Sequence, residues 1–97
     1  DDLRESPSLK LIELLQKHGA LVHYNDDYVT SIPKLRKYSF NKKSVKITPS
    51  NLKKYDLILL STDHSYYDYG MILKNSRIVI DTRNGFGKLK SKKIYKA

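Results

Sequence analysis

The sequence predicts an α/β domain with a mostly parallel sheet, and three observations support this. Two short apolar runs, residues 57–60 and 78–80, have turn residues on both sides, as is typical of strands buried in a parallel sheet. Segments with helical character alternate with these runs along the chain. A polar turn follows each run, and the carboxyl ends of the strands are where such sheets bind ligands.

Composition restricts the function classes open to the chain. Its 97 residues are enough for one small domain with one core. The absence of cysteine excludes disulfides, cysteine metal sites and a cysteine nucleophile within this chain. Nineteen Lys and Arg against ten Asp and Glu give a net charge of +9, which indicates an anionic partner, either nucleic acid or a phosphorylated small molecule. No apolar run approaches the ~20 residues of a membrane helix, and no signal-peptide pattern is present, so we expect no membrane partner.

The first predicted element is an amphipathic helix over residues 8–18. Ser6 is a suitable N-cap, and Pro7 fits the first helical position, where no amide hydrogen is needed. Gly19 is placed to end the helix in the left-handed conformation. The predicted apolar face repeats with helical spacing and comprises Leu11, Leu14, Leu15 and His18, widened by Ile12.

A strand is predicted for residues 20–24, ended by the polar residues 25–27. Residues 28–44 are rich in Lys and Arg and lack a clear period, which predicts a long loop. Val45 and Ile47 alternate with polar neighbours, as in an edge strand.

The second half of the chain begins with Thr48-Pro49, a cap-plus-proline signal that predicts a short helix to about residue 54. The strand at 57–60 is followed by a helix over 66–74 and by the strand at 78–80. A basic tail with a last strand at residues 94–95 completes the predicted order.

Polar turns at the strand ends are the candidate binding residues. They are Tyr24-Asn25-Asp26, Thr62-Asp63-His64 and Asp81-Thr82-Arg83-Asn84. Arg4 lies just before the start of the first helix, where a guanidinium and free amides could bind a phosphate. Taken alone, residues 1–8 favour a surface ion pair of Arg4 with Asp1, Asp2 or Glu5 instead.

These turns, together with Asp2-Leu3-Arg4-Glu5-Ser6-Pro7, occur in an order and spacing that resembles the C-terminal domain of the UDP-glucose/GDP-mannose dehydrogenase family. The sequence around these motifs is most similar to the branch of the family that acts on UDP-N-acetylglucosamine or UDP-N-acetylmannosamine. The resemblance covers residues 1–84 and implies a Rossmann-like, three-layer domain over residues 1–97, of which the first strand is missing.

The resemblance also implies a function. Members of this family are cytoplasmic, homo-oligomeric enzymes that use NAD to oxidise the sugar 6-hydroxyl of a UDP-sugar to a carboxylate. Arg4 matches the arginine that reaches the cofactor NAD, and Arg83 matches the arginine that helps to hold the nucleotide sugar. Guanidinium suits both ligands because its forked donors match phosphate and ribose oxygens.

The chain departs from the family pattern in three respects. It lacks the NAD domain and the central helical domain, and with them the cysteine and the glycine-rich loop. It begins after the first strand of the C-terminal domain, so the substrate-binding lysine of that strand is absent. Asp27 stands where the family usually has proline. We therefore expect the chain alone to be catalytically inactive.

Other interpretations remain open at this point. The net charge and the basic stretch with interleaved aromatics at 34–46 are compatible with a small nucleic-acid-binding module, although no recognition helix, RNA-binding strand signature or zinc pattern supports nucleic acid as a partner. A phosphoacceptor domain would need a lysine close after the last strand, where Arg83 stands instead.

His64 could be a general acid or base, but we favour a polar residue lining the strand end. Asp26 and Asp81 could pair, but strand-end aspartates more often cap turns.

Overall fold

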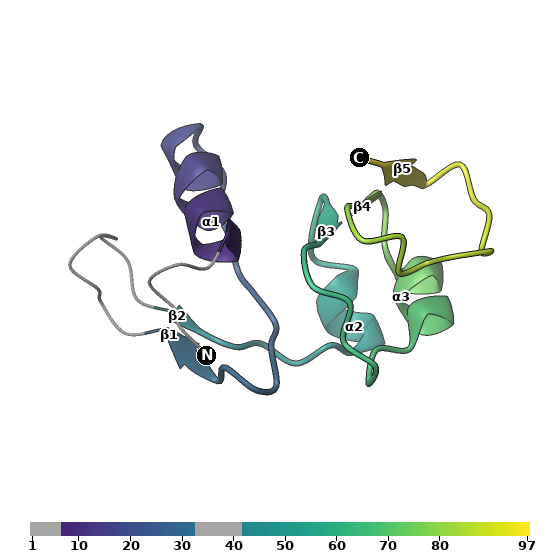
Figure 1. The fold of residues 1–97 in the computed structure, drawn as a ribbon, viewed down its shortest axis with the longest axis horizontal. Helices are drawn as coiled ribbons and strands as arrows, with labels where there is room; N and C mark the ends of the chain where they lie inside the picture. The colour runs from purple at the N-terminus through teal and green to yellow at the C-terminus, as the bar shows by residue number, and fades with distance from the viewer. Residues whose placement is uncertain (1–6, 33–41) are drawn as a thin grey trace. The chain divides into compact units, whose positions relative to one another are not determined.

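The computed structural model describes residues 7–32 and 42–97 (Figure 1). The chain divides into two compact units, Asp1–Lys46 and Ile47–Ala97, each of which has its own buried cluster. Chain length alone predicted a single core. The predicted α/β class with a parallel sheet is confirmed, and the sheet lies in the second unit. No helix in the described ranges is long and apolar enough to cross a membrane.

The first unit begins with α1 (Pro7–Lys17). Gly19 has a φ of 90°, and the amide of Ala20 donates to the carbonyl of Leu15, so the predicted left-handed end of the helix is confirmed. The predicted apolar face is wrong in detail. Leu9 and Ile12 are buried, whereas Leu14 is 45% exposed and His18 is exposed.

The buried face of α1 is set by the segments that pack on it. Ile32 completes the cluster with Leu9 and Ile12, and Val22, Tyr24 and Val29 pack around it. A helical period identifies an amphipathic helix, but the choice between two adjacent apolar stripes depends on these distant residues. The Ser6 cap and Arg4 lie outside the described residues.

The predicted strand at 20–24 is wrong, because the segment belongs to no ladder. The amide of Val45 donates to the carbonyl of Tyr24, and the Lys42 ammonium donates to the carbonyl of Val22 at 2.6 Å. Isolated bonds of this kind satisfy the carbonyls without a neighbouring strand.

The loop predicted at 28–44 contains two short strands, β1 (Ser31–Ile32) and β2 (Lys42–Lys43). They pair antiparallel, with Ser31 opposite Lys43. The predicted edge strand at Val45 and Ile47 does not form. Two-residue strands carry too little pattern for period-2 alternation to reveal them.

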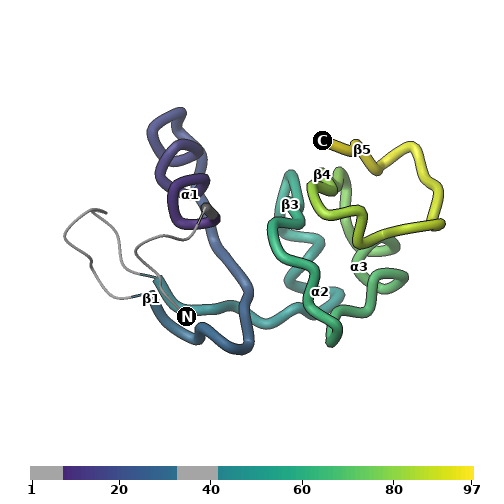
Figure 2. Tube along the Cα trace, in the orientation of Figure 1, coloured from purple at the N-terminus to yellow at the C-terminus, as the bar shows by residue number. Residues whose placement is uncertain are grey.

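The second unit begins with α2 (Pro49–Leu52), where Thr48 is the N-cap and accepts from the amide of Asn51 at 3.1 Å. The cap-plus-proline prediction is therefore confirmed. Next come β3 (Ile58–Leu60), α3 (Tyr69–Asn75), β4 (Val79–Asp81) and β5 (Ile94–Lys96), and Figure 2 traces this order. The helix predicted from residue 66 begins three residues later, because the Asp68 carboxylate caps it by accepting from the Met71 amide.

The three strands form one parallel sheet in the order β3-β4-β5. Leu60 lies opposite Asp81, and Asp81 lies opposite Lys96, so the carboxyl ends of all three strands share one edge. The predicted strands at 57–60, 78–80 and 94–95 are thus confirmed within one residue at each end. In the described structure Leu60 is buried but Leu57 is 39% exposed, so β3 is less enclosed than its apolar run predicted.

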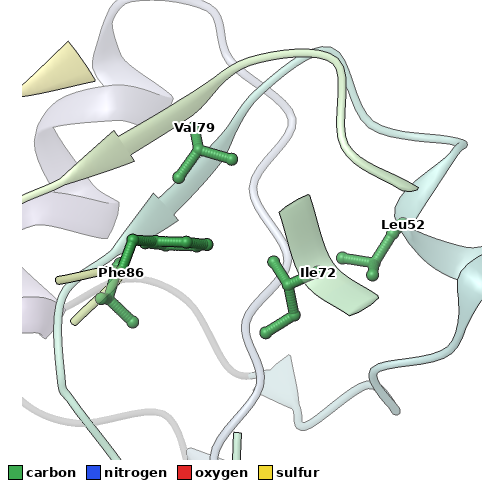
Figure 3. Packing of buried hydrophobic residues seen from close by; sticks show 5 residues of the cluster. Leu52, Ile72, Val79 and Phe86 are labelled. Carbon is green, nitrogen blue, oxygen red and sulfur yellow. The ribbon is translucent and has the colours of Figure 1, made fainter. Parts of the chain in front are cut away.

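The core of the second unit lies between the sheet and α2 and α3 (Figure 3). Val79 is fully buried, and the cluster is completed by Leu52, Leu60, Ile72 and Phe86. Phe86 belongs to the loop after β4 and fixes the first half of this loop to the core. The Lys93 ammonium donates to the carbonyl of Leu73 at the end of α3, which favours a cation there.

Candidate functional site

The loop after β4 is organised around the carboxylate of Asp81, which is only 1% exposed. Its Oδ1 accepts from the amides of Arg83 at 3.0 Å and Gly85 at 3.1 Å, and its Oδ2 accepts from the amide of Phe86 at 3.0 Å. Burial acts to raise the pKa of Asp81, but the amides of Phe86, Arg83, Gly85 and Asn84 outweigh it, so the pKa lies below its ordinary value. Asp81 is therefore an ionised cap of its own turn, as the sequence favoured.

Thr82 and Gly85 lie close to β3 and fix the position of the loop against it. The Thr82 hydroxyl donates to the carbonyl of Leu60 at 2.6 Å, and the Thr82 amide donates to the same oxygen at 3.3 Å. A Cβ at Gly85 would lie 2.5 Å from Leu60 Cδ2 and 2.8 Å from the Tyr69 hydroxyl. An added side chain would therefore force the ends of the Leu60 and Tyr69 side chains to shift, so close packing favours glycine at this position.

A third contact fixes the loop from β5. The Lys96 ammonium donates to Asn84 Oδ1 at 2.9 Å. Asn84 has a φ of 55°, a left-handed conformation that asparagine tolerates better than most residues. The loop is therefore held from β3, β4 and β5 together.

The turn after β3 lies beside this loop and is rich in aromatic side chains. The Tyr69 hydroxyl donates to the Asp63 carboxylate, and the Tyr69 ring lies 4.9 Å from the Phe86 ring, centroid to centroid. Burial, the hydrogen bond to Asp63 and the charges of Asp63 and Asp81 raise the pKa of Tyr69 well above its ordinary value. This phenol therefore keeps its proton and joins the two turns.

His64 is half-buried and stacks on Tyr66, with a centroid distance of 4.9 Å and an interplanar angle of 13°. It also meets the edge of Tyr67 at 5.4 Å. These contacts agree with a residue that lines the strand end. The sequence predicted that the helix begins at Tyr66, but Tyr66 and Tyr67 both lie before α3.

Arg83 is exposed, and its amide is bound to Asp81. Within residues 7–32 and 42–97, its guanidinium forms no ion pair or side-chain hydrogen bond. The chain after Asp81 adds more positive charge without any acidic residue, from Lys88, Lys90, Lys92, Lys93 and Lys96. A guanidinium on an ordered loop in a basic surrounding can bind an anion.

The structure brings together two of the three predicted turns, since residues 62–64 and 81–84 follow the neighbouring strands β3 and β4. Asp26 belongs to the first unit, where its Oδ1 accepts from the amides of Tyr28 and Val29 and so caps a turn. The described residues contain no group of three or more His, Cys, Asp or Glu that could hold a metal ion.

Comparison with known families decides the relationship. Residues 1–88 match the model of the UDP-glucose/GDP-mannose dehydrogenase family, UDP binding domain. The chain belongs to this family. The match includes the positions of Arg4 and Arg83 and ends before β5. No curated protein and no solved structure matched the chain in the corresponding comparisons. The family membership supports a UDP-binding domain of a dehydrogenase and lends no support to the nucleic-acid-binding alternative.

Sequence reasoning missed three residues of this site: Gly85, Phe86 and Lys96. The signal for Gly85 was present, because glycine directly after a strand-end turn often marks a close backbone approach. Phe86 and Lys96 act through tertiary contacts that no local pattern encodes.

Proposed function

We propose that this domain binds the UDP-sugar substrate of an NAD-dependent nucleotide-sugar 6-dehydrogenase, with Arg83 as a substrate-binding residue. The observation that carries the proposal is the exposed Arg83 guanidinium on a loop fixed at the ligand edge of a UDP-binding domain. The positive charge of residues 83–96 favours approach of the anionic nucleotide.

The finer parts of the proposal rest on the family relationship. The reaction is oxidation of the sugar 6-hydroxyl to a carboxylate, and the sugar is of the UDP-N-acetylglucosamine or UDP-N-acetylmannosamine type. The parent enzyme is a cytoplasmic homo-oligomer whose NAD is bound mainly by another domain. Arg4 is the cofactor-side residue of the present chain, on the strength of its family position and its place before the Ser6-Pro7 helix start.

The central test is the substitution Arg83→Ala. In the full-length enzyme that carries this domain, it should raise the KM for the UDP-sugar at least ~10-fold, as expected for the loss of a charged hydrogen bond. In the 97-residue chain, UDP binding followed by NMR titration should weaken by a similar factor.

Two controls sharpen this test. Arg4→Ala should weaken NAD more than the UDP-sugar, whereas Arg83→Ala should do the reverse. ADP in place of UDP should bind more weakly to the unmodified chain, because a specific site depends on the uridine while a general cation surface does not. An Arg83→Ala variant with unchanged KM and unchanged UDP affinity would exclude the proposed role.

A further inference from the structure

The backbone amides of the loop after β4 point inward to Asp81. In many phosphate sites, successive amides of a loop with one left-handed residue form a concave nest that binds an anion. The loop has such a residue, Asn84. The backbone amides of Arg83, Gly85 and Phe86 converge on the two carboxylate oxygens of Asp81. The anion that they bind is the chain's own carboxylate.

An amide that donates to a buried carboxylate is not available to a ligand. Replacing Asp81 as the acceptor would require a phosphate to enter a position that is 1% exposed and already holds a negative charge. An external anion must therefore interact with the loop through side chains, and Arg83 is the exposed cation within residues 82–86, the part of the loop that Asp81 orders.

We propose that Asp81 is a positioning residue for UDP binding: its carboxylate fills the loop as an internal anion and orders it, so that the loop binds the nucleotide through the Arg83 side chain and not through its backbone amides. This inference rests on the proposed function, because it assigns UDP to Arg83. It adds a residue that never contacts the ligand and a mode of binding that excludes the amides.

Order at Arg83 follows from the contacts on both sides of it. Its own amide is fixed to Asp81, Thr82 before it is bonded to Leu60, and Asn84 after it is bonded to Lys96. A guanidinium on a loop held in this way loses less conformational freedom on binding than one on a mobile loop. Loosening the loop should therefore lower the affinity for UDP only by disturbing the position of the Arg83 side chain.

A double-mutant cycle tests this dependence. Asp81→Asn keeps the shape and one acceptor oxygen but places an amide group where a second acceptor is needed. We compare UDP affinity, by NMR titration of the 97-residue chain, for the unmodified chain, Asp81→Asn, Arg83→Ala and the double variant. Asp56→Asn is the matched control, because the Asp56 side chain is fully exposed and lies 3.7 Å from Arg77.

The expected result is non-additive. Asp81→Asn and Arg83→Ala each weaken UDP, by roughly 10-fold for Arg83→Ala, while the double variant is no weaker than Arg83→Ala alone. Asp56→Asn leaves the affinity unchanged. A further loss of the same factor in the Arg83→Ala background would show that Asp81 acts independently of Arg83 and would overturn the inference.

The two proposals fail in different ways. If Arg83→Ala weakens UDP but Asp81→Asn does not, only the positioning role is wrong. If Arg83→Ala leaves UDP affinity unchanged, the proposed function fails and the inference fails with it.

A measurement on the unmodified chain decides the matter if Asp81→Asn does not fold. Hydrogen exchange of the Arg83, Gly85 and Phe86 amides should be slow without ligand, and saturating UDP should leave it unchanged while shifting the Arg83 side-chain signal. Fast exchange that UDP slows would mean that the amides bind the nucleotide, and this would overturn the inference.

Discussion

Asp81 is the residue on which the second unit's candidate site depends most directly. Its folded-state pKa lies below the ordinary value, so the unfolded chain binds a proton more readily than the folded chain. The stabilisation is therefore fully present above the unfolded pKa of ~3.9 and is lost as the pH falls through the folded pKa.

This gives a prediction for acid unfolding. The free energy of unfolding, measured by urea denaturation, should fall more steeply below pH ~4 in the unmodified chain than in Asp81→Asn. At neutral pH the Asn variant should be less stable by about 1–3 kcal/mol, because a buried amide donor of the loop loses its acceptor. Asp56→Asn, at a fully exposed position, serves as the control and should follow the unmodified chain. Parallel pH profiles for the unmodified chain and Asp81→Asn would contradict the assignment.

Residues whose role is local were predictable from the sequence. Gly19 ends α1, Thr48 caps α2, and Asp26 and Asp81 cap turns, each through contacts within five positions along the chain. Residues whose role is tertiary were not predictable in this way. Leu9 and not Leu14 is buried because Ile32 packs on that side of the helix.

At the scale of elements, β3, α3 and the loop after β4 meet at Gly85. Any side chain at this position would contact Leu60 and the Tyr69 hydroxyl at distances too short for van der Waals packing. Glycine at residue 85 leaves room for Leu60 and Tyr69 where the loop that carries Arg83 approaches the sheet.

Gly85→Ala should therefore destabilise the chain by about 1–3 kcal/mol, as forced overpacking of a core does, and should also weaken UDP binding by displacing the loop. The measurements are thermal or urea denaturation and the same UDP titration. Gly70→Ala in α3 is the matched control, because the added Cβ lies 3.7 Å from the nearest atom, Asp68 Oδ1, and alanine favours a helix. Equal stability of the two variants would show that the close approach at Gly85 is not rigid.

The elements of the second unit were predictable because their signals are short-range and consistent. The strands at 57–60 and 78–80 have apolar runs between turn residues, and α2 has its cap and proline. The segment at 20–24 has a mostly apolar sequence but forms no ladder, because a strand exists only where a neighbour pairs with it. Pairing depends on residues far away in the chain, which local patterns do not contain.

At the scale of the whole molecule, the family match and the architecture agree on a nucleotide-binding domain. The parallel sheet places the turns after β3 and β4 at one edge, and the sequence correctly predicted that edge as the location of the polar residues. The sequence predicted that Asp81 caps its turn, but the burial of its carboxylate could not be predicted, because it depends on tertiary packing.

We expect this chain to bind the nucleotide without catalysing the oxidation. The 97 residues contain no cysteine and no glycine-rich phosphate loop of the kind that binds a dinucleotide. The chain holds a candidate site for the nucleotide but no cysteine nucleophile for the sugar oxidation. Purified chain mixed with NAD and a UDP-sugar should therefore produce no NADH, as followed by absorbance. The same preparation should bind UDP in the NMR titration, which shows that inactivity does not come from misfolding. Production of NADH at a rate that follows the concentration of the purified chain would contradict this separation, and with it the assignment of the chemistry to other parts of the parent enzyme.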